Sequence, residues 1–143
     1  MVQFLREYYS DCKTQLRFDW CRFSGTKNIM PFDFGLIDKK ILIELDGEQH
    51  FTQISNWDSP ENVQRKDTEK IQHCIANGWS IIHIYQADVW KDTYDWRTVM
   101  KQAIEEAEKS EPMVLFISSK DTYQSHSNKL NSTIACKVIQ PTY

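Results

Sequence analysis

The stretch PFDFGLIDKKILIELDGEQH, which runs from Pro31 to His50, decides the fold. Two short runs of alternating apolar residues, Pro31–Ile37 and Ile41–Asp46, flank the polar segment Asp38–Lys40. Alternation with a period of two predicts strands, and a short polar connection between them predicts an antiparallel β-hairpin. Pro31 fits as the first residue of its strand, where the missing N–H does little harm to the ladder.

Three carboxylates are expected to share one face of this hairpin. Successive side chains of a strand point to opposite faces, so Glu44 and Asp46 lie on the same face. With a tight turn between the strands, Asp33 falls directly or diagonally opposite Glu44. The apolar residues assigned to the opposite, core face are Phe32, Phe34, Leu36, Ile41, Ile43 and Leu45.

A divalent cation would explain this grouping. Neighbouring carboxylates repel one another, and in isolation one of them would take up a proton. A bound cation removes the conflict, and oxygen ligands in this arrangement suit Mg²⁺ or Mn²⁺. The alternative is a solvated face with lysine partners, which is the usual situation for a single strand carboxylate. Three carboxylates on one hairpin face favour the metal site.

The rest of the chain alternates between helical and strand patterns, which predicts an α/β protein with a mixed sheet flanked by helices. Ser59 is expected to cap a helix that starts at Pro60, and Gly78 to follow its end. Residues 24–28 are expected to form a turn and residues 118–133 a loop. Predicted helices are Val2–Lys13, Pro60–Asn77 and Tyr94–Lys109; further predicted strands are Leu16–Phe23, Trp79–Tyr85, Met113–Ile117 and, at an edge, Thr133–Ile139.

The helix after Pro60 has polar residues in its apolar stripe. Val63, Asp67, Lys70 and Cys74 follow at spacings of four, three and four, so they share one face. Asp67 and Lys70 either form a local ion pair or both point toward the hairpin carboxylates. In the second case the lysine would stabilise charge on a phosphate or hold an attacking water. Spacing alone favours neither interpretation.

Composition sets wider limits on function. The 143 residues suit one domain with a real core, and the net charge of −3 argues against a protein that coats nucleic acid through a broad basic surface. It leaves DNA open as a substrate. The four cysteines have no zinc-finger spacing and are expected to be reduced thiols. No signal peptide or membrane-spanning run is visible, so a cytoplasmic or nuclear location is expected.

Four parts of the sequence carry a family resemblance: PFDF at 31–34, IELDGEQH at 43–50, the helix residues Arg65, Asp67 and Lys70, and GWSII at 78–82. Together they resemble the PD-(D/E)XK nuclease superfamily, in particular its small branch akin to very-short-patch-repair endonucleases, which includes endonuclease-like proteins of phages and large DNA viruses. The resemblance covers about residues 2–97. It implies a restriction-endonuclease-like α-β-β-β-α-β core, with residues 98–143 as a C-terminal extension that holds a helix and one or two strands.

The resemblance also implies metal-dependent hydrolysis of DNA phosphodiester bonds. Asp33 matches the first metal-binding acid of the family and Glu44 the second, with the Leu45 carbonyl as a further ligand. The family's usual Glu-x-Lys would place a lysine where this chain has Asp46. Asp46 is therefore expected to be an additional metal ligand.

Some members of the superfamily carry the lysine on the following helix instead. Lys70 is the natural candidate, with Lys66 in reserve. Gln49, His50 and Asp67 match residues near the active site of the same branch. His50 or Asp67 would handle protons, and Gln49 would hydrogen-bond water or a neighbouring ligand, although a lone histidine after a strand is more often structural.

Several alternatives stay open on the sequence alone. The substrate could be a junction, a mismatch or RNA rather than ordinary duplex DNA. Asp46 in place of lysine also leaves room for a catalytically inactive, nuclease-derived DNA-binding module. A homodimer would help so small a nuclease cut both strands, but no interface is specified. Trp57 is the aromatic residue to test for DNA contact, although tryptophan more often belongs to the core. Arg65 and Lys66 either meet phosphates or form a solvated face.

Overall fold

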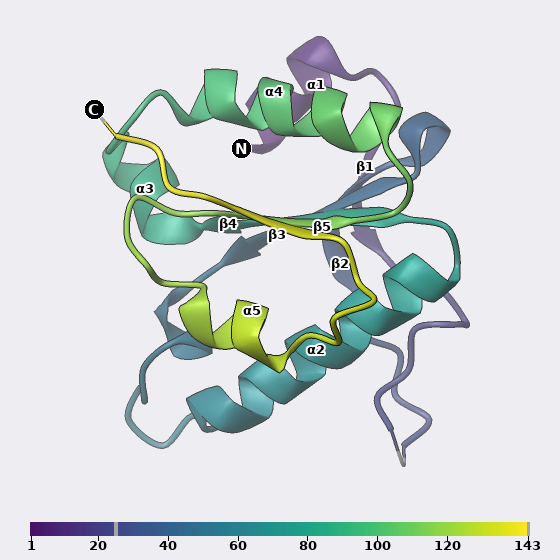
Figure 1. Ribbon diagram of the computed structural model, residues 1–143, viewed down its shortest axis with the longest axis vertical. Helices are drawn as coiled ribbons and strands as arrows, with labels where there is room; N and C mark the ends of the chain where they lie inside the picture. The colour runs from purple at the N-terminus through teal and green to yellow at the C-terminus, as the bar shows by residue number, and fades with distance from the viewer. Residues whose placement is uncertain (25, 143) are drawn as a thin grey trace.

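A central β-sheet lies between two layers of helices in the computed structural model, which describes residues 1–24 and 26–142 (Figure 1). Helices α1 (Val2–Tyr8) and α4 (Trp96–Lys109) cover one face, and α2 (Pro60–Ala76) and α5 (Gln124–Lys129) cover the other. This arrangement confirms the predicted α/β class with a mixed sheet flanked by helices. Gly25, in the turn expected at 24–28, and Tyr143 lie outside the described residues.

Across the described residues the six strands lie side by side in the order of the chain. Neighbouring strands are antiparallel from the first to the third strand and parallel from the third to the sixth. Helix α2 connects the third strand to the fourth, while α3 (Gln86–Lys91) and α4 connect the fourth to the fifth. The strands are β1 (Cys12–Leu16), β2 (Phe32–Leu36), β3 (Ile41–Asp46), β4 (Ser80–Tyr85), β5 (Val114–Ile117) and β6 (Cys136–Ile139).

The predicted hairpin is formed by β2 and β3. Phe34 pairs with Ile43 and Leu36 with Ile41, and the 3₁₀ turn η1 (Ile37–Lys39) joins the strands. A second 3₁₀ turn, η2 (Glu48–His50), follows β3 directly.

The predicted ends of α2 are also confirmed. The Ser59 hydroxyl accepts a hydrogen bond from the Asn62 N–H at 3.1 Å, which satisfies a free donor of the first turn. Pro60 is the first helical residue, where its missing N–H has no helical partner to lose. Gly78 follows the helix with φ of +83°, a conformation that suits glycine because it has no Cβ.

The N-terminal region differs from the prediction. The first helix ends at Tyr8, and the edge strand is Cys12–Leu16, not Leu16–Phe23. The aromatic residues that suggested a strand cover the end of the sheet instead: Phe18 stacks on Trp20 at 4.6 Å between centroids and also contacts Trp79. Aromatic enrichment here reflects packing, not strand propensity.

Smaller differences lie in the C-terminal part. α4 begins at Trp96, capped by the Asp95 side chain, so Tyr94 precedes it. β6 spans only Cys136–Ile139 of the predicted 133–139 strand. The segment 118–133, predicted as a loop, contains the short helix α5.

Each face of the sheet carries its own apolar cluster. As predicted, Ile41 and Ile43 pack toward α1 and α4. Phe32 is an exception, because it packs on the α2 side. Its partner strand has Gln15 at φ of +51° between the pairs Thr14–Phe34 and Leu16–Phe32.

The four cysteines are free thiols, as predicted, and Cys136 alone among them is exposed. None of the helices in the described part of the chain has the length and apolar content needed to cross a membrane.

Candidate functional site

A cleft of about 460 Å³ opens between the β2–β3 hairpin, η2 and α2. Nearly all of the residues singled out in the sequence line this cleft, although they come from four separate elements. Asp46 does not, since it is buried, and neither do Trp57 and Arg65. The predicted site residues that line the cleft are Asp33, Glu44, Leu45, Gln49, His50, Lys66, Asp67 and Lys70.

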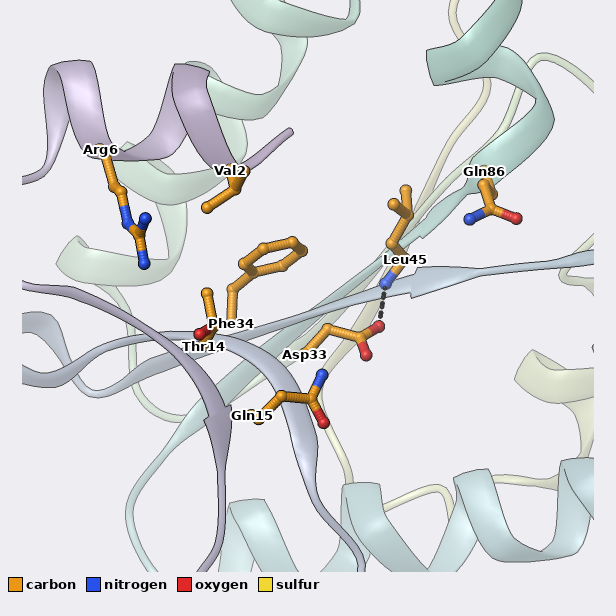
Figure 2. A pocket seen from close by; sticks show the side chains of 8 residues that line it. All are labelled: Val2, Arg6, Thr14, Gln15, Asp33, Phe34, Leu45 and Gln86. Carbon is orange, nitrogen blue, oxygen red and sulfur yellow. Dashed lines mark hydrogen bonds between the residues drawn. The ribbon is translucent and has the colours of Figure 1, made fainter.

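Asp33 stands where the two strands of the hairpin separate. One step beyond the last ladder pair, Phe34–Ile43, the register places Asp33 opposite Glu44. The Asp33 carboxylate accepts a hydrogen bond from the Leu45 N–H at 2.9 Å (Figure 2). Because the N–H and C=O of a strand residue point toward the same neighbour, the Leu45 carbonyl is directed to the same side as Asp33.

A second cavity of about 490 Å³ extends from Asp33 and Leu45 toward α1 (Figure 2). Arg6 of α1 and Gln86 of α3 line it together with Gln15 of β1. Asp33 and Leu45 therefore form a wall shared by two open spaces, and the carboxylate is accessible from both.

Glu44 and Lys70 form a buried ion pair across the cleft. The Lys70 ammonium donates to the Glu44 carboxylate and to the Pro31 carbonyl at 2.7 Å, and it lies 4.7 Å from the centroid of the Phe32 ring. Burial raises the pKa of Glu44 to about 8, with a further contribution from Asp33, although Lys70 opposes the shift. Of the two interpretations of Lys70, the one in which it points toward the hairpin carboxylates is confirmed.

Lys66, the reserve lysine, occupies a different position. Its ammonium lies 3.5 Å from the Asp58 carboxylate, and both side chains are more than 40% exposed. Lys66 therefore lies at the mouth of the cleft, whereas Lys70 lies at its floor.

His50 lies between two carboxylates. Its Nδ1 is 2.6 Å from the Asp67 carboxylate, and its Nε2 is 3.7 Å from that of Asp46. Burial would lower the pKa of His50, but the hydrogen bond to Asp67 and the charges of Asp46 and Asp67 outweigh it and raise the pKa to about 9.

Asp67 accepts from a second histidine. His126 of α5 places its Nε2 3.0 Å from the same oxygen that contacts His50. Burial would raise the pKa of Asp67, but the hydrogen bonds from His126 and His50 hold it well below its usual range. The ligand atoms of His50, Asp67 and His126 all lie within 4.8 Å of one another.

Asp46 has a buried network of its own. The same oxygen of its carboxylate accepts from the His83 Nδ1 at 2.7 Å and from the Tyr123 hydroxyl at 2.9 Å. Burial would lower the pKa of His83, but Asp46 outweighs this effect and raises it. The other oxygen of Asp46 faces His50.

Among the remaining sequence candidates, Gln49 lines the cleft, whereas Trp57 and Arg65 do not. Gln49 belongs to η2, and its side-chain oxygen packs against Gly47, where an added Cβ would lie only 2.5 Å away. Trp57 is 57% exposed in the loop after η2. Arg65 lies on the outer side of α2 and packs its guanidinium over the ring of Phe23.

Sequence reasoning missed three buried polar residues of this site: His83, Tyr123 and His126. His83 had a signal, because it is the one basic residue in the apolar strand Trp79–Tyr85. Tyr123 and His126 had none, since they lie in a polar segment that reads as a loop.

The donor set near Asp33 fits a hard divalent cation. Two carboxylates and a backbone carbonyl supply oxygen ligands of the kind that Mg²⁺ prefers. Burial raises the pKa of Glu44 despite its ion pair with Lys70. Additional positive charge at this point would stabilise the ionised carboxylates.

No protein-family model, curated protein or solved structure matches this chain.

Proposed function

We propose that this protein is a Mg²⁺- or Mn²⁺-dependent endonuclease that hydrolyses DNA phosphodiester bonds. One observation carries the proposal: a single cleft gathers two carboxylates, a buried lysine and a histidine–aspartate pair from β2, β3, η2 and α2. These are the groups that metal-assisted phosphodiester hydrolysis requires, namely ligands, a cation for developing charge and a proton carrier.

The order of elements supports the assignment to the PD-(D/E)XK superfamily. The chain runs α1-β1-β2-β3-α2-β4, with an antiparallel β1–β2–β3 meander and β4 parallel to β3. This is the α-β-β-β-α-β order that the sequence resemblance implies. Fold alone does not define function, so the proposal rests on the residues of the cleft.

Asp33, Glu44 and the Leu45 carbonyl would hold the metal ion. When bound, the ion would activate a water molecule and neutralise charge on the phosphate. Asp46 remains predicted as an additional ligand through the oxygen that faces His50.

Lys70 would serve as the working cation of the site. It contacts Glu44 from α2, and it would thereby take the role of the lysine that Glu-x-Lys places on the strand, where this chain has Asp46. There it would stabilise negative charge that develops on the phosphate oxygens.

His50 and Asp67 would move the proton. Asp67 fixes the Nδ1 side of the ring, so the Nε2 side is the one directed toward the hairpin carboxylates. Gln49, on the rim of the same cleft, would hydrogen-bond the water or a phosphate oxygen.

Plasmid cleavage in Mg²⁺ or Mn²⁺ tests the proposal. We expect Asp33→Asn and Glu44→Gln to abolish nicking, because each removes a charged metal ligand while keeping its shape. Glu106→Gln, which changes a half-exposed carboxylate on α4, is the matched control and should cut normally. Wild-type rates in both cleft variants, or no cutting by the wild type on linear, nicked, mismatched, four-way or RNA substrates, would refute it.

A further inference from the structure

The C-terminal segment holds both carboxylates that flank His50. Tyr123 and His126 stand three residues apart, at the start of α5. The Tyr123 hydroxyl donates to Asp46, and the His126 Nε2 lies at hydrogen-bond distance from Asp67. One turn of chain therefore reaches both aspartates, from the side away from the cleft.

Helix α5 also supports the backbone of His50, through Gln64 of α2. The Gln64 side chain donates to the His50 carbonyl at 2.8 Å. On α5, the Ser125 hydroxyl donates to the Gln64 side-chain oxygen at 2.7 Å, and Lys129 donates to the same atom. The ring and the backbone of His50 are thus both fixed by residues of α2 that α5 holds in turn.

Apolar packing does not account for these polar groups. Tyr123 and His126 are almost fully buried, and their rings pack against Phe51 and Phe116. Phenylalanine or leucine would fill that space without the cost of burying a hydroxyl and an imidazole. Both groups instead form hydrogen bonds with charged carboxylates, and such hydrogen bonds are strong and directional.

We propose that Tyr123 and His126 are positioning residues, which hold Asp46 and Asp67 so that His50 faces the phosphate in a single orientation. The kinetic test of this proposal rests on the proposed function, whereas the contacts themselves do not depend on it. It extends the site from the hairpin and α2 to α5, which lies outside residues 2–97, the part of the chain that carries the family resemblance.

A kinetic experiment separates positioning from packing. Outer partners of a catalytic group commonly contribute about 10- to 100-fold to activity. We expect Tyr123→Phe and His126→Met to lower kcat by about that factor with little change in KM, because substrate contacts stay intact. His126→Gln should recover most of the loss, since its Nε2 can reach Asp67 as the imidazole does.

The controls are Gln124→Ala, at an exposed position of α5, and His73→Asn, a histidine of α2 outside the cleft. Both should retain the wild-type kcat. Equal activity of His126→Met and His126→Gln, at equal Tm, would show a packing role and overturn the proposal.

A second measurement does not depend on nuclease activity. A proton on His50 Nδ1 that is held by Asp67 should give a downfield signal by NMR. We expect this signal to shift or broaden in folded Tyr123→Phe and His126→Met and to persist in His126→Gln. An unchanged signal in the first two variants would refute positioning. If the wild type fails to cut any substrate, the proposed function fails and this spectrum still decides the inference.

Discussion

The two faces of the sheet are both buried, yet they bury different chemistry. Toward α1 and α4 the core is built from residues such as Leu36, Ile43 and Ile104. Toward α2 and α5 the interior also contains charged or polar side chains. They are Glu44, Asp46, Gln64, Asp67, His83 and His126.

The difference separates the parts of the molecule that give stability from those suited to chemistry. Apolar burial stabilises the fold, whereas buried charges lose hydration that a partner restores only in part. A protein that needed only a core would have no reason to place six such residues under one helix layer. The α2 face therefore gives up some stability, which is typical of functional sites.

The largest effect is expected from removing the buried cation of the α2 face. Lys70→Met should lower DNA cleavage by on the order of 10²- to 10³-fold, because one donor to developing charge is lost. Lys66→Met should cost less than about tenfold, as expected for one exposed phosphate contact. Rates measured on plasmid DNA, with the exposed Lys137→Met as control, decide between them. An equal loss for Lys66→Met would reverse the assignment.

On the apolar face the effect should fall on stability alone. Ile104 of α4 is fully buried, and Ile104→Ala removes packed methyl and methylene groups. We expect the free energy of unfolding to drop by about 2–5 kcal/mol, measured by urea denaturation. The kcat of the folded fraction should match the wild type. A drop in kcat comparable to that of Lys70→Met would show that the two faces do not divide in this way.

The smallest effect concerns pH. The pKa of His50 rises from 6.5 to about 9 on folding, so its charged form is favoured in the folded state. This stabilisation is fully present below pH 6.5 and is lost as the pH rises through 9. The free energy of unfolding of the wild type relative to His50→Gln should therefore fall by roughly 3 kcal/mol over that window.

Denaturation series at several pH values measure this difference. Asp67→Asn, which removes the partner of the imidazolium, should flatten the curve as His50→Gln does. If the difference in the free energy of unfolding between the wild type and His50→Gln stays constant from pH 6 to pH 9.5, the raised pKa of His50 is contradicted.

Local patterns predicted the centre of the site well. Alternation placed Asp33 opposite Glu44, and helical spacing put Lys70 in the apolar stripe of α2 but left open whether it reached the hairpin, because both rules act over a few residues. They failed where a contact is distant: the hydrogen bonds of Asp46 to His83 and Tyr123 span 37 and 77 residues. No periodicity in residues 118–133 predicts α5, which packs on α2 through polar side chains.

The separation of Asp67 and His126 along the sequence has a consequence for folding during synthesis. Fifty-nine residues separate the two side chains, and Tyr123 follows Asp46 by 77. At about 5–20 residues per second, a ribosome needs roughly 3–12 s to add the first of these intervals. We therefore expect a nascent chain to acquire its hairpin and α2 seconds before the anchors of His50 exist. The timing of synthesis would keep the proposed activity low until the C-terminal segment has docked.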